Sequence, residues 1–289
     1  MKTLFQLILL TICLAFTFIL LSAILPYSEA FKNLSSHIEL KDVIYLLIVS
    51  FWICFTILYV AKKANHSEMR VALALSFSLF FIYGLMSSID NLLFENTWVV
   101  LNKKDIWLQI IESGVAILFI SILGVKLFGV KYRPSKYSKT PKSFTTLESV
   151  IKLILVGMSY VILHFTLNYF IKWEVSNAHI TYAGNSQLND FVNYLVTNWN
   201  DQPLIYLFQF IKGILFGLFI LPIVYLFRKS STQMLTAIFL IFGTTALFQL
   251  IPNYLIPIDI RMGAFLEISC LMFLFSLFTC LIFNKLKMS

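Results

Sequence analysis

Charged residues are scarce in this chain. Asp, Glu, Lys and Arg make up only 12% of its 289 residues, whereas an average soluble domain contains about 25%. Apolar residues account for 59%, and the mean hydropathy is +0.85. This composition excludes a soluble globular enzyme. Disorder is excluded as well, because 29 Phe, 13 Tyr and 5 Trp carry more apolar surface than a disordered chain can leave in water.

Cysteine and histidine are also few, with four residues of each type. The cysteines all lie inside apolar runs, where they are typical of small buried hydrophobic residues. They are Cys13, Cys54, Cys270 and Cys280. The histidines lie in four different segments, without the HxxxH or HExxH spacing of a metal site. The sequence therefore predicts no disulfide framework, no metal site and no cofactor.

The motifs of several large enzyme classes are missing. The chain has no Walker phosphate loop, no GxSxG elbow and no glycine-rich dinucleotide turn. Each of these motifs places a nucleophile or a phosphate-binding backbone where its chemistry needs it. The sequence therefore gives no support for an ATP-driven pump or for a hydrolase of these classes. If the protein is an enzyme, its catalytic residues are unknown.

Long apolar runs are what the chain does contain. A helix needs about 20 mostly apolar residues to cross about 30 Å of hydrocarbon, and lipid offers no hydrogen-bond partner to an open backbone. Eight runs meet this requirement, at residues 4–25, 42–61, 71–89, 106–128, 149–171, 203–227, 234–254 and 262–283. The sequence thus predicts an all-α polytopic membrane protein with eight transmembrane helices.

The first run has an alternative interpretation as a secretory signal, because Lys2 precedes it and Ser28-Glu29-Ala30 follows it. Signal cores are about 7 to 15 residues long, and this run is longer. We therefore expect it to be retained as the first transmembrane helix.

Basic residues are unevenly divided between the loops. With both termini placed in the cytoplasm, 15 of the 22 Lys and Arg residues fall on that side, six fall outside and Lys212 lies within a run. Because Lys and Arg are retained on the cytoplasmic side, both termini are predicted to be cytoplasmic. The compact loops favour a multi-pass protein of a bacterial cytoplasmic membrane.

The densest basic segment lies between the fourth and fifth runs. It contains Lys131, Arg133, Lys136, Lys139 and Lys142. Each such charge contributes about 1 kcal/mol near an anionic lipid surface, so this segment is expected to bind anionic lipid. No nucleic-acid binding is expected, because the segment is short, lacks a folded module and lies beside a membrane.

Two internal matches indicate a repeat. Residues 59–69 resemble residues 225–234, and residues 105–113 resemble residues 259–269, at equivalent run boundaries. Four spans per half is an even number, so the halves of this 4+4 repeat enter the membrane from the same side, as a parallel repeat. The predicted divisions are a first four-helix half at 1–130, a basic cytoplasmic linker at 131–148, and a second four-helix half at 149–289 with an outer loop at 172–202.

Several polar side chains lie in the outer half of the predicted spans. An ionisable group at depth costs about 2.5 to 3.5 kcal/mol, so it normally faces a bundle interior or a wet cavity. The alternative is a structural role, because interhelical hydrogen bonds contribute about 0.6 kcal/mol each. The candidates for ligand or ion binding are Glu112, His164, Lys212, Gln249, Arg261 and Glu267.

Two further patterns concern the second half. Gly213 and Gly217 have the GxxxG spacing that lets a neighbouring helix approach closely. Within the outer loop, apolar residues recur at helical spacing from Leu188 to Trp199. This pattern predicts a short interfacial helix, which either covers a polar pocket or only connects two spans.

Three functions fit these features. A secondary transporter or flippase-like carrier would use Glu112 and Glu267 to carry protons or a cation, with Lys212 or Arg261 as an anion-binding group or counter-ion. A membrane-embedded enzyme acting on an outer-leaflet lipid would use His164 or Glu267 as general base. A non-catalytic assembly or immunity partner would use the polar groups for structure alone. The architecture favours the transporter, without indicating its small-molecule or lipid ligand.

Overall fold

The computed structural model describes residues 2–35, 39–93, 102–130, 146–175, 190–250 and 258–285. All regular structure in these ranges is helical, and eight helices in them are long and apolar enough to cross a membrane. The prediction of an all-α protein with eight membrane-spanning helices is therefore confirmed. The helices that form the spans are α1 (Lys2–Ile24), α3 (Leu40–Lys63), α4 (Glu68–Leu79), α6 (Lys103–Phe128), α7 (Thr146–Leu167), α10 (Pro203–Phe227), α11 (Ser231–Phe248) and α12 (Ile258–Lys285).

Two spans contain π-helical segments. The third span continues from α4 through η1 (Phe80–Leu85) into α5 (Met86–Leu93), and the fifth continues from α7 into η2 (Asn168–Val175). A π-helix widens the turn and often occurs at functional sites.

Local sequence sets several helix ends. The Asn102 side chain accepts a hydrogen bond from the Asp105 backbone N–H at the start of α6, which satisfies one of the orphan donors of a first turn. Gly129, with a φ of 68°, ends the same helix. The predicted end of the seventh run at residue 254 was wrong, because α11 ends at Phe248 and Gln249 is its C-cap. Helices usually end before a proline, and Pro252 follows shortly after.

The predicted connections between spans are only partly covered by the described residues. Of the linker 131–148, residues 131–145 lie outside the described residues and the last three belong to α7. The five basic residues expected to bind anionic lipid lie in that undescribed part. Of the outer loop 172–202, residues 172–175 belong to η2 and residues 176–189 lie outside the described residues. The helix α9 (Phe191–Asp201) forms most of the remainder.

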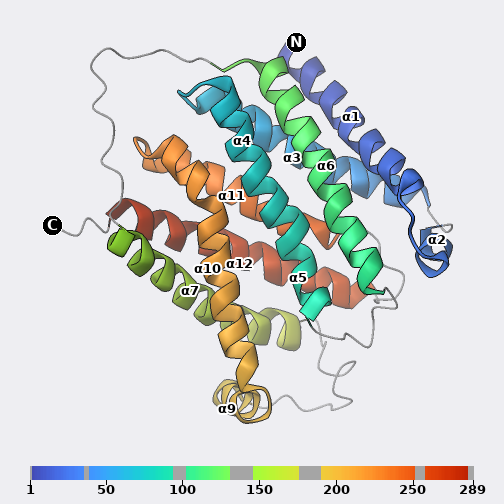
Figure 1. The fold of residues 1–289 in the computed structure, drawn as a ribbon. Helices are drawn as coiled ribbons and strands as arrows, with labels where there is room; N and C mark the ends of the chain where they lie inside the picture. Colours follow the sequence, from blue (N-terminus) through green and yellow to red (C-terminus); the bar gives the residue numbers. More distant parts are fainter. Residues whose placement is uncertain are drawn as a thin grey trace.

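The helix predicted in the outer loop is confirmed as α9. Its Val192, Val196 and Trp199 side chains are exposed, as expected of an apolar face that rests in the membrane interface. A second short helix, α2 (Glu29–Ser35), lies between the first and second spans of the first half, just as α9 lies between the fifth and sixth. Figure 1 shows both at the margins of the bundle. We call the end of the spans that lies beside α9 the α9 end. The other end, which contains the connections at residues 64–67 and 228–230, is called the opposite end.

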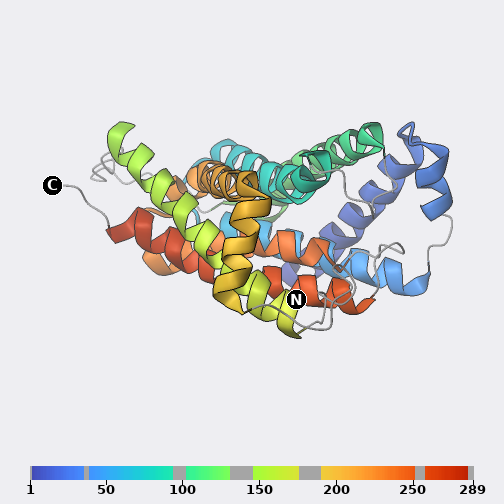
Figure 2. The same ribbon diagram turned by 90° about the horizontal axis from the view of Figure 1, so that it is seen from below.

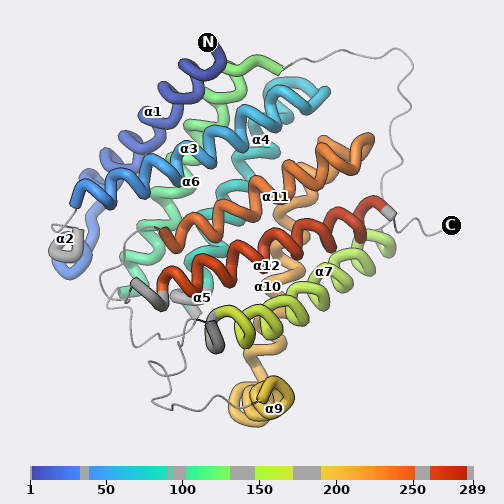
Figure 3. The backbone as a smooth tube through the Cα atoms, turned by 180° about the vertical axis from the view of Figure 1, so that it is seen from behind, coloured from blue at the N-terminus to red at the C-terminus, as the bar shows by residue number. Residues whose placement is uncertain are grey.

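The eight spans pack in a reciprocal pattern. In each group of four, the first span contacts the second and the fourth, and the third contacts the fourth. Between the groups, α3 packs on α11 (Figure 3) and α4 packs on α10 (Figure 1). The second span of each group therefore meets the third span of the other. The two groups lie side by side when the molecule is seen from below (Figure 2).

Each of the two contacts between groups includes a hydrogen bond between helices. The Trp52 indole N–H donates to the Leu240 carbonyl at 2.8 Å, which joins α3 to α11. The Ser78 hydroxyl donates to the Phe219 carbonyl at 2.7 Å, which joins α4 to α10. The groups are not identical, since α3 packs more extensively on α6 than α10 does on α12. A two-fold axis would produce such a reciprocal pairing, and the internal repeat stays a prediction.

The GxxxG segment lies where α7 and α10 are closest. A Cβ atom added at Gly213 would lie 2.6 Å from Cβ of Tyr160 and 2.9 Å from the Cα of Gly157. Only glycine leaves room for this contact, so the prediction of close helix packing within the chain is confirmed.

We expect Gly213→Ala to destabilise the protein by about 1 to 3 kcal/mol, because the added methyl group meets backbone atoms that have nowhere to move. Thermal unfolding in detergent measures the effect. Ile211→Ala, on the exposed side of the same helix, is the control and should change the transition little. Equal stability of Gly213→Ala and the wild type would contradict the close packing.

Candidate functional site: two polar clusters

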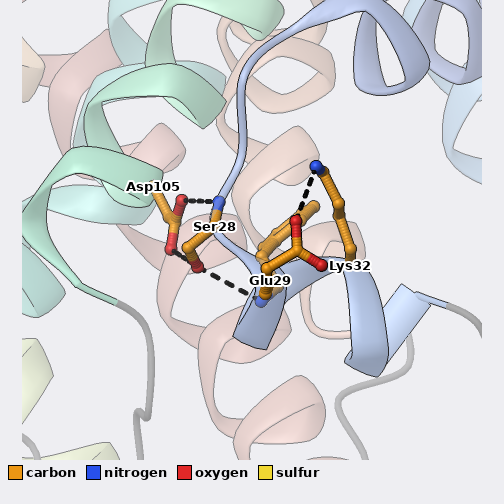
Figure 4. Close-up of polar contacts among 5 residues, drawn as sticks. Ser28, Glu29, Lys32 and Asp105 are labelled. Atoms are coloured by element: carbon orange, nitrogen blue, oxygen red, sulfur yellow. Dashed lines mark hydrogen bonds and ion pairs between the residues drawn. The ribbon is translucent and has the colours of Figure 1, made fainter.

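The first polar cluster joins the segment after α1 to the start of α6. The Asp105 carboxylate is fully buried and accepts hydrogen bonds from the Ser28 backbone N–H at 2.9 Å and from the Ser28 hydroxyl at 2.5 Å. Figure 4 shows these contacts beside the exposed Lys32–Glu29 ion pair of α2. A buried carboxylate needs such donors, because an unpaired one is expensive in a low dielectric.

Glu112 belongs to the same cluster. It lies two turns further along α6, about 10 Å from Asp105 at helical rise, and accepts a hydrogen bond from the Tyr27 hydroxyl. Tyr27 is buried and its ring stacks on Phe31. Burial, followed by the hydrogen bond to Glu112 and its charge, raises the pKa of Tyr27 above its ordinary value. The phenol therefore stays protonated and remains a donor to the carboxylate.

The π-helix η1 forms one side of this cluster. Tyr83 of η1 interacts electrostatically with Glu112. A Cβ atom at Gly84 would lie 3.1 Å from Cβ of Ser113, and one at Gly114 would lie 2.8 Å from the Phe80 ring. The irregular turn of the third span is thus pressed against the part of α6 that carries the buried glutamate.

The second polar cluster lies in the other group of helices. His164 of α7 and Glu267 of α12 approach each other, with 4.0 Å between Nδ1 and Oε1, and the Glu267 side chain is only 4% exposed. This distance exceeds that of a hydrogen bond, and the contact is an ion pair only when the imidazole is protonated. The two candidates that the sequence placed on different spans are therefore neighbours.

Helix α9 covers this second cluster. Burial and then the charge of Glu267 raise the pKa of Tyr194, which lies on α9. The Tyr206 hydroxyl of α10 donates to the Leu195 carbonyl of α9 at 2.9 Å, and the Tyr206 ring stacks on Phe165 of α7. These contacts hold the interfacial helix over the ends of α7 and α10, so it is more than a connector.

Lys212 lies at the level of this cluster. Tyr160, Phe216 and Phe275 form an aromatic layer between α7, α10 and α12, with ring centroids 5.1 to 5.9 Å apart. His164 and Lys212 each lie one turn from that layer toward the α9 end, which is about 6 Å at helical rise. Glu267 lies two turns from the layer in the same direction, which is about 12 Å. Lys212 is also buried, and its ammonium group lies 6.0 Å from the centroid of the Phe208 ring.

Two buried acceptors flank these ionisable groups. Oε1 of Gln209 and Oδ1 of Asn168 accept no hydrogen bond from the described part of the chain. Gln209 is three residues from Lys212, and Asn168 is one turn from His164. Buried polar atoms normally have partners, so these two carbonyl oxygens mark a place where a ligand or ion with donor groups would be stabilised.

The six candidates from the sequence thus separate. His164 and Glu267 are neighbours in the second group, and Lys212 is buried one turn from the same aromatic layer. Glu112 lies with Tyr27 in the first group. Gln249 lies beyond the end of α11. Arg261 lies six residues before Glu267 on α12, about 9 Å away at helical rise.

Sequence reasoning missed the two tyrosines that complete the clusters. Tyr27 and Tyr194 both lie in segments between spans, where an aromatic residue is typical of an interface anchor. Their equivalent positions could have indicated a shared role, because each tyrosine lies between the first and the second span of a predicted half.

No protein-family model matches this chain, and no curated protein or solved structure is significantly similar to it.

We expect Tyr27→Phe to lower the free energy of unfolding by about 1 to 3 kcal/mol, because it removes the donor to a buried carboxylate. Thermal unfolding of the purified protein tests this. Tyr59→Phe, whose ring packs on Phe227 between the groups, is the control and should have a small effect. If Tyr27→Phe in a Glu112→Gln background costs as much as it does alone, the two residues are not coupled.

Proposed function

We propose that this chain is a secondary transporter or flippase-like carrier driven by protons, with the second polar cluster as its coupling site. The observation that carries the proposal is the contact between His164 and the buried Glu267, at 4.0 Å, beneath α9. A buried ion pair is weak evidence for stability, and ionisable residues inside a membrane mark proton or substrate pathways by default. An unperturbed imidazole titrates near pH 6.5, which suits the exchange of protons at physiological pH.

The arrangement of the spans supports a carrier. Parallel repeats related by an axis along the membrane normal can rock against each other around a central site. The reciprocal contacts of α3 with α11 and of α4 with α10 provide such a boundary between two groups of four spans. Each group also carries a glutamate on its fourth span, the half-buried Glu112 on α6 and the buried Glu267 on α12.

Each polar side chain then has a role. Glu267 and His164 hold the coupling proton. Lys212 supplies the compensating positive charge when the carboxylate is ionised, as an internal counter-ion. The acceptor oxygens of Gln209 and Asn168 receive hydrogen bonds from the substrate or from hydrated cations.

One observation also favours a second function, a membrane-embedded enzyme acting on a lipid. A histidine next to a buried carboxylate is the arrangement that a general base and its orienting group require. Glu267 would orient the imidazole of His164, and Lys212 would stabilise negative charge on the substrate. The carrier is preferred because the division into two groups of spans has no role in this enzyme.

We expect Glu267→Gln to abolish substrate-driven proton flux, because the amide cannot take up a proton at this position. Proteoliposomes that enclose a pH-sensitive dye are exposed to a panel of amino acids, sugars and organic cations with an imposed proton gradient. The matched control is Glu68→Gln, which changes an exposed carboxylate at the opposite end of the bundle and should transport normally. Flux that persists in Glu267→Gln would refute the coupling site.

The same preparations distinguish the enzyme. If no compound drives protons and a new lipid species forms in wild-type vesicles but not with His164→Gln, the second function is correct and the carrier is wrong. Thin-layer chromatography of the extracted lipid measures this.

Lys212 and Glu267 should compensate each other's charge. Lys212→Leu or Glu267→Leu alone is expected to destabilise the protein by about 3 to 5 kcal/mol, since each strands a buried charge. The double variant should recover most of this loss without recovering proton flux. Lys212→Leu with Glu112→Leu is the control pair and should show additive losses in thermal unfolding. Recovery of flux in the Lys212–Glu267 double variant would make these groups purely structural.

A further inference from the structure

A groove of about 940 Å³ runs along one side of the bundle, away from the second polar cluster. Its walls come from α4, η1, α6 and α10, which lie side by side in Figure 1. Apolar side chains line most of it, among them Leu73, Phe77, Phe80, Leu118 and Pro222. Leu73, Phe77 and Leu118 are exposed although they belong to membrane-spanning helices. The surroundings of this groove are therefore the acyl chains of the bilayer.

The mouth of the groove is polar and positively charged. His66, Ser67 and Arg70 line it at the opposite end of the bundle from α9. Arg70 and Lys229 both act on His66 through their charges, and the Leu226 carbonyl accepts a hydrogen bond from its ring. Burial and these two cations lower the pKa of His66. Glu68, the acidic residue nearest in sequence, does not line the groove. The mouth thus complements a negative group.

The length of the groove matches one leaflet. Met69 and Phe81 are the first and last lining residues of the third span and are twelve residues apart, which is about 18 Å at helical rise. The hydrocarbon core is about 30 Å thick, so the apolar part extends from the headgroup region to about the bilayer centre. A single acyl chain of a lipid in that leaflet has the same extent.

We propose that this groove binds an anionic phospholipid of the surrounding membrane, with the phosphate held by the Arg70 guanidinium beside the Ser67 hydroxyl and one acyl chain along Leu73, Phe77 and Leu118. Arg is well suited to this contact, because its guanidinium can form two parallel hydrogen bonds to phosphate oxygens. The mouth lies on the side predicted to be cytoplasmic, which is the leaflet where anionic lipids are enriched. This site is separate from the proposed coupling site and does not depend on it.

Native mass spectrometry tests the site with phosphatidylglycerol and phosphatidylcholine of identical chains, supplied in equal amounts to the purified full-length protein in detergent. The wild type is expected to retain one phosphatidylglycerol per chain in preference to phosphatidylcholine. Arg70→Gln should weaken phosphatidylglycerol binding about tenfold to a hundredfold, because it removes a charged hydrogen bond. Leu118→Trp, which fills the groove, should reduce the binding of both lipids.

Lys63→Gln is the matched control, because Lys63 is an exposed basic residue at the same end of the bundle and does not line the groove. It should bind lipid as the wild type does, and the basic residues between 131 and 142 are the same in every variant. The proposal is overturned if Lys63→Gln weakens binding as much as Arg70→Gln does, which would indicate diffuse attraction to the membrane. It is also overturned if Leu118→Trp retains full binding, or if the wild type shows no preference between the lipids.

Discussion

The low dielectric of the bilayer requires every buried ionisable group to have a partner, and in this protein those partners come from distant parts of the chain. Asp105 is held by Ser28 and Glu112 by Tyr27, so the end of the first span is fastened to the fourth. His164 and Glu267 make the equivalent connection between the fifth and eighth spans. Apolar packing alone gives weak direction in a membrane, because lipid tails are as apolar as the helices. The polar pairs therefore specify which spans are neighbours.

The boundary between the two groups of spans is built differently. It is largely apolar, and its hydrogen bonds go to two backbone carbonyls. Trp52 and Thr56 donate to that of Leu240, and Ser78 donates to that of Phe219. Interhelical bonds of this kind contribute about 0.6 kcal/mol each. The Asp105, Glu112 and His164–Glu267 contacts, by contrast, each lie within one group of spans. In the proposed carrier, this division would let each group move as a unit.

The number of spans was predictable because bilayer thickness sets a length that apolar runs either reach or do not. Tyr27 and Tyr194 were not predictable as partners of Glu112 and Glu267, since a contact between residues 85 or 73 positions apart leaves no local pattern in one sequence. The π-helices were invisible for a different reason, because hydropathy does not depend on how the turn is wound. The end of α11 was misjudged, since apolar residues continue beyond Phe248 and hydropathy alone does not register a cap.

The η1 segment lies between the apolar groove and the first polar cluster. Gly114 and Leu118 line the deep part of the groove, while Glu112 lies only two residues before Gly114 on the same helix. What separates them is the Phe80 ring, which lies so close to Gly114 that no larger residue would fit there. Phe80 begins the π-helix, a geometry that often occurs at functional sites. The Phe80 ring thus holds the apolar groove apart from the half-buried Glu112 carboxylate, and in the proposed carrier this ring is the barrier that a conformational change would have to move.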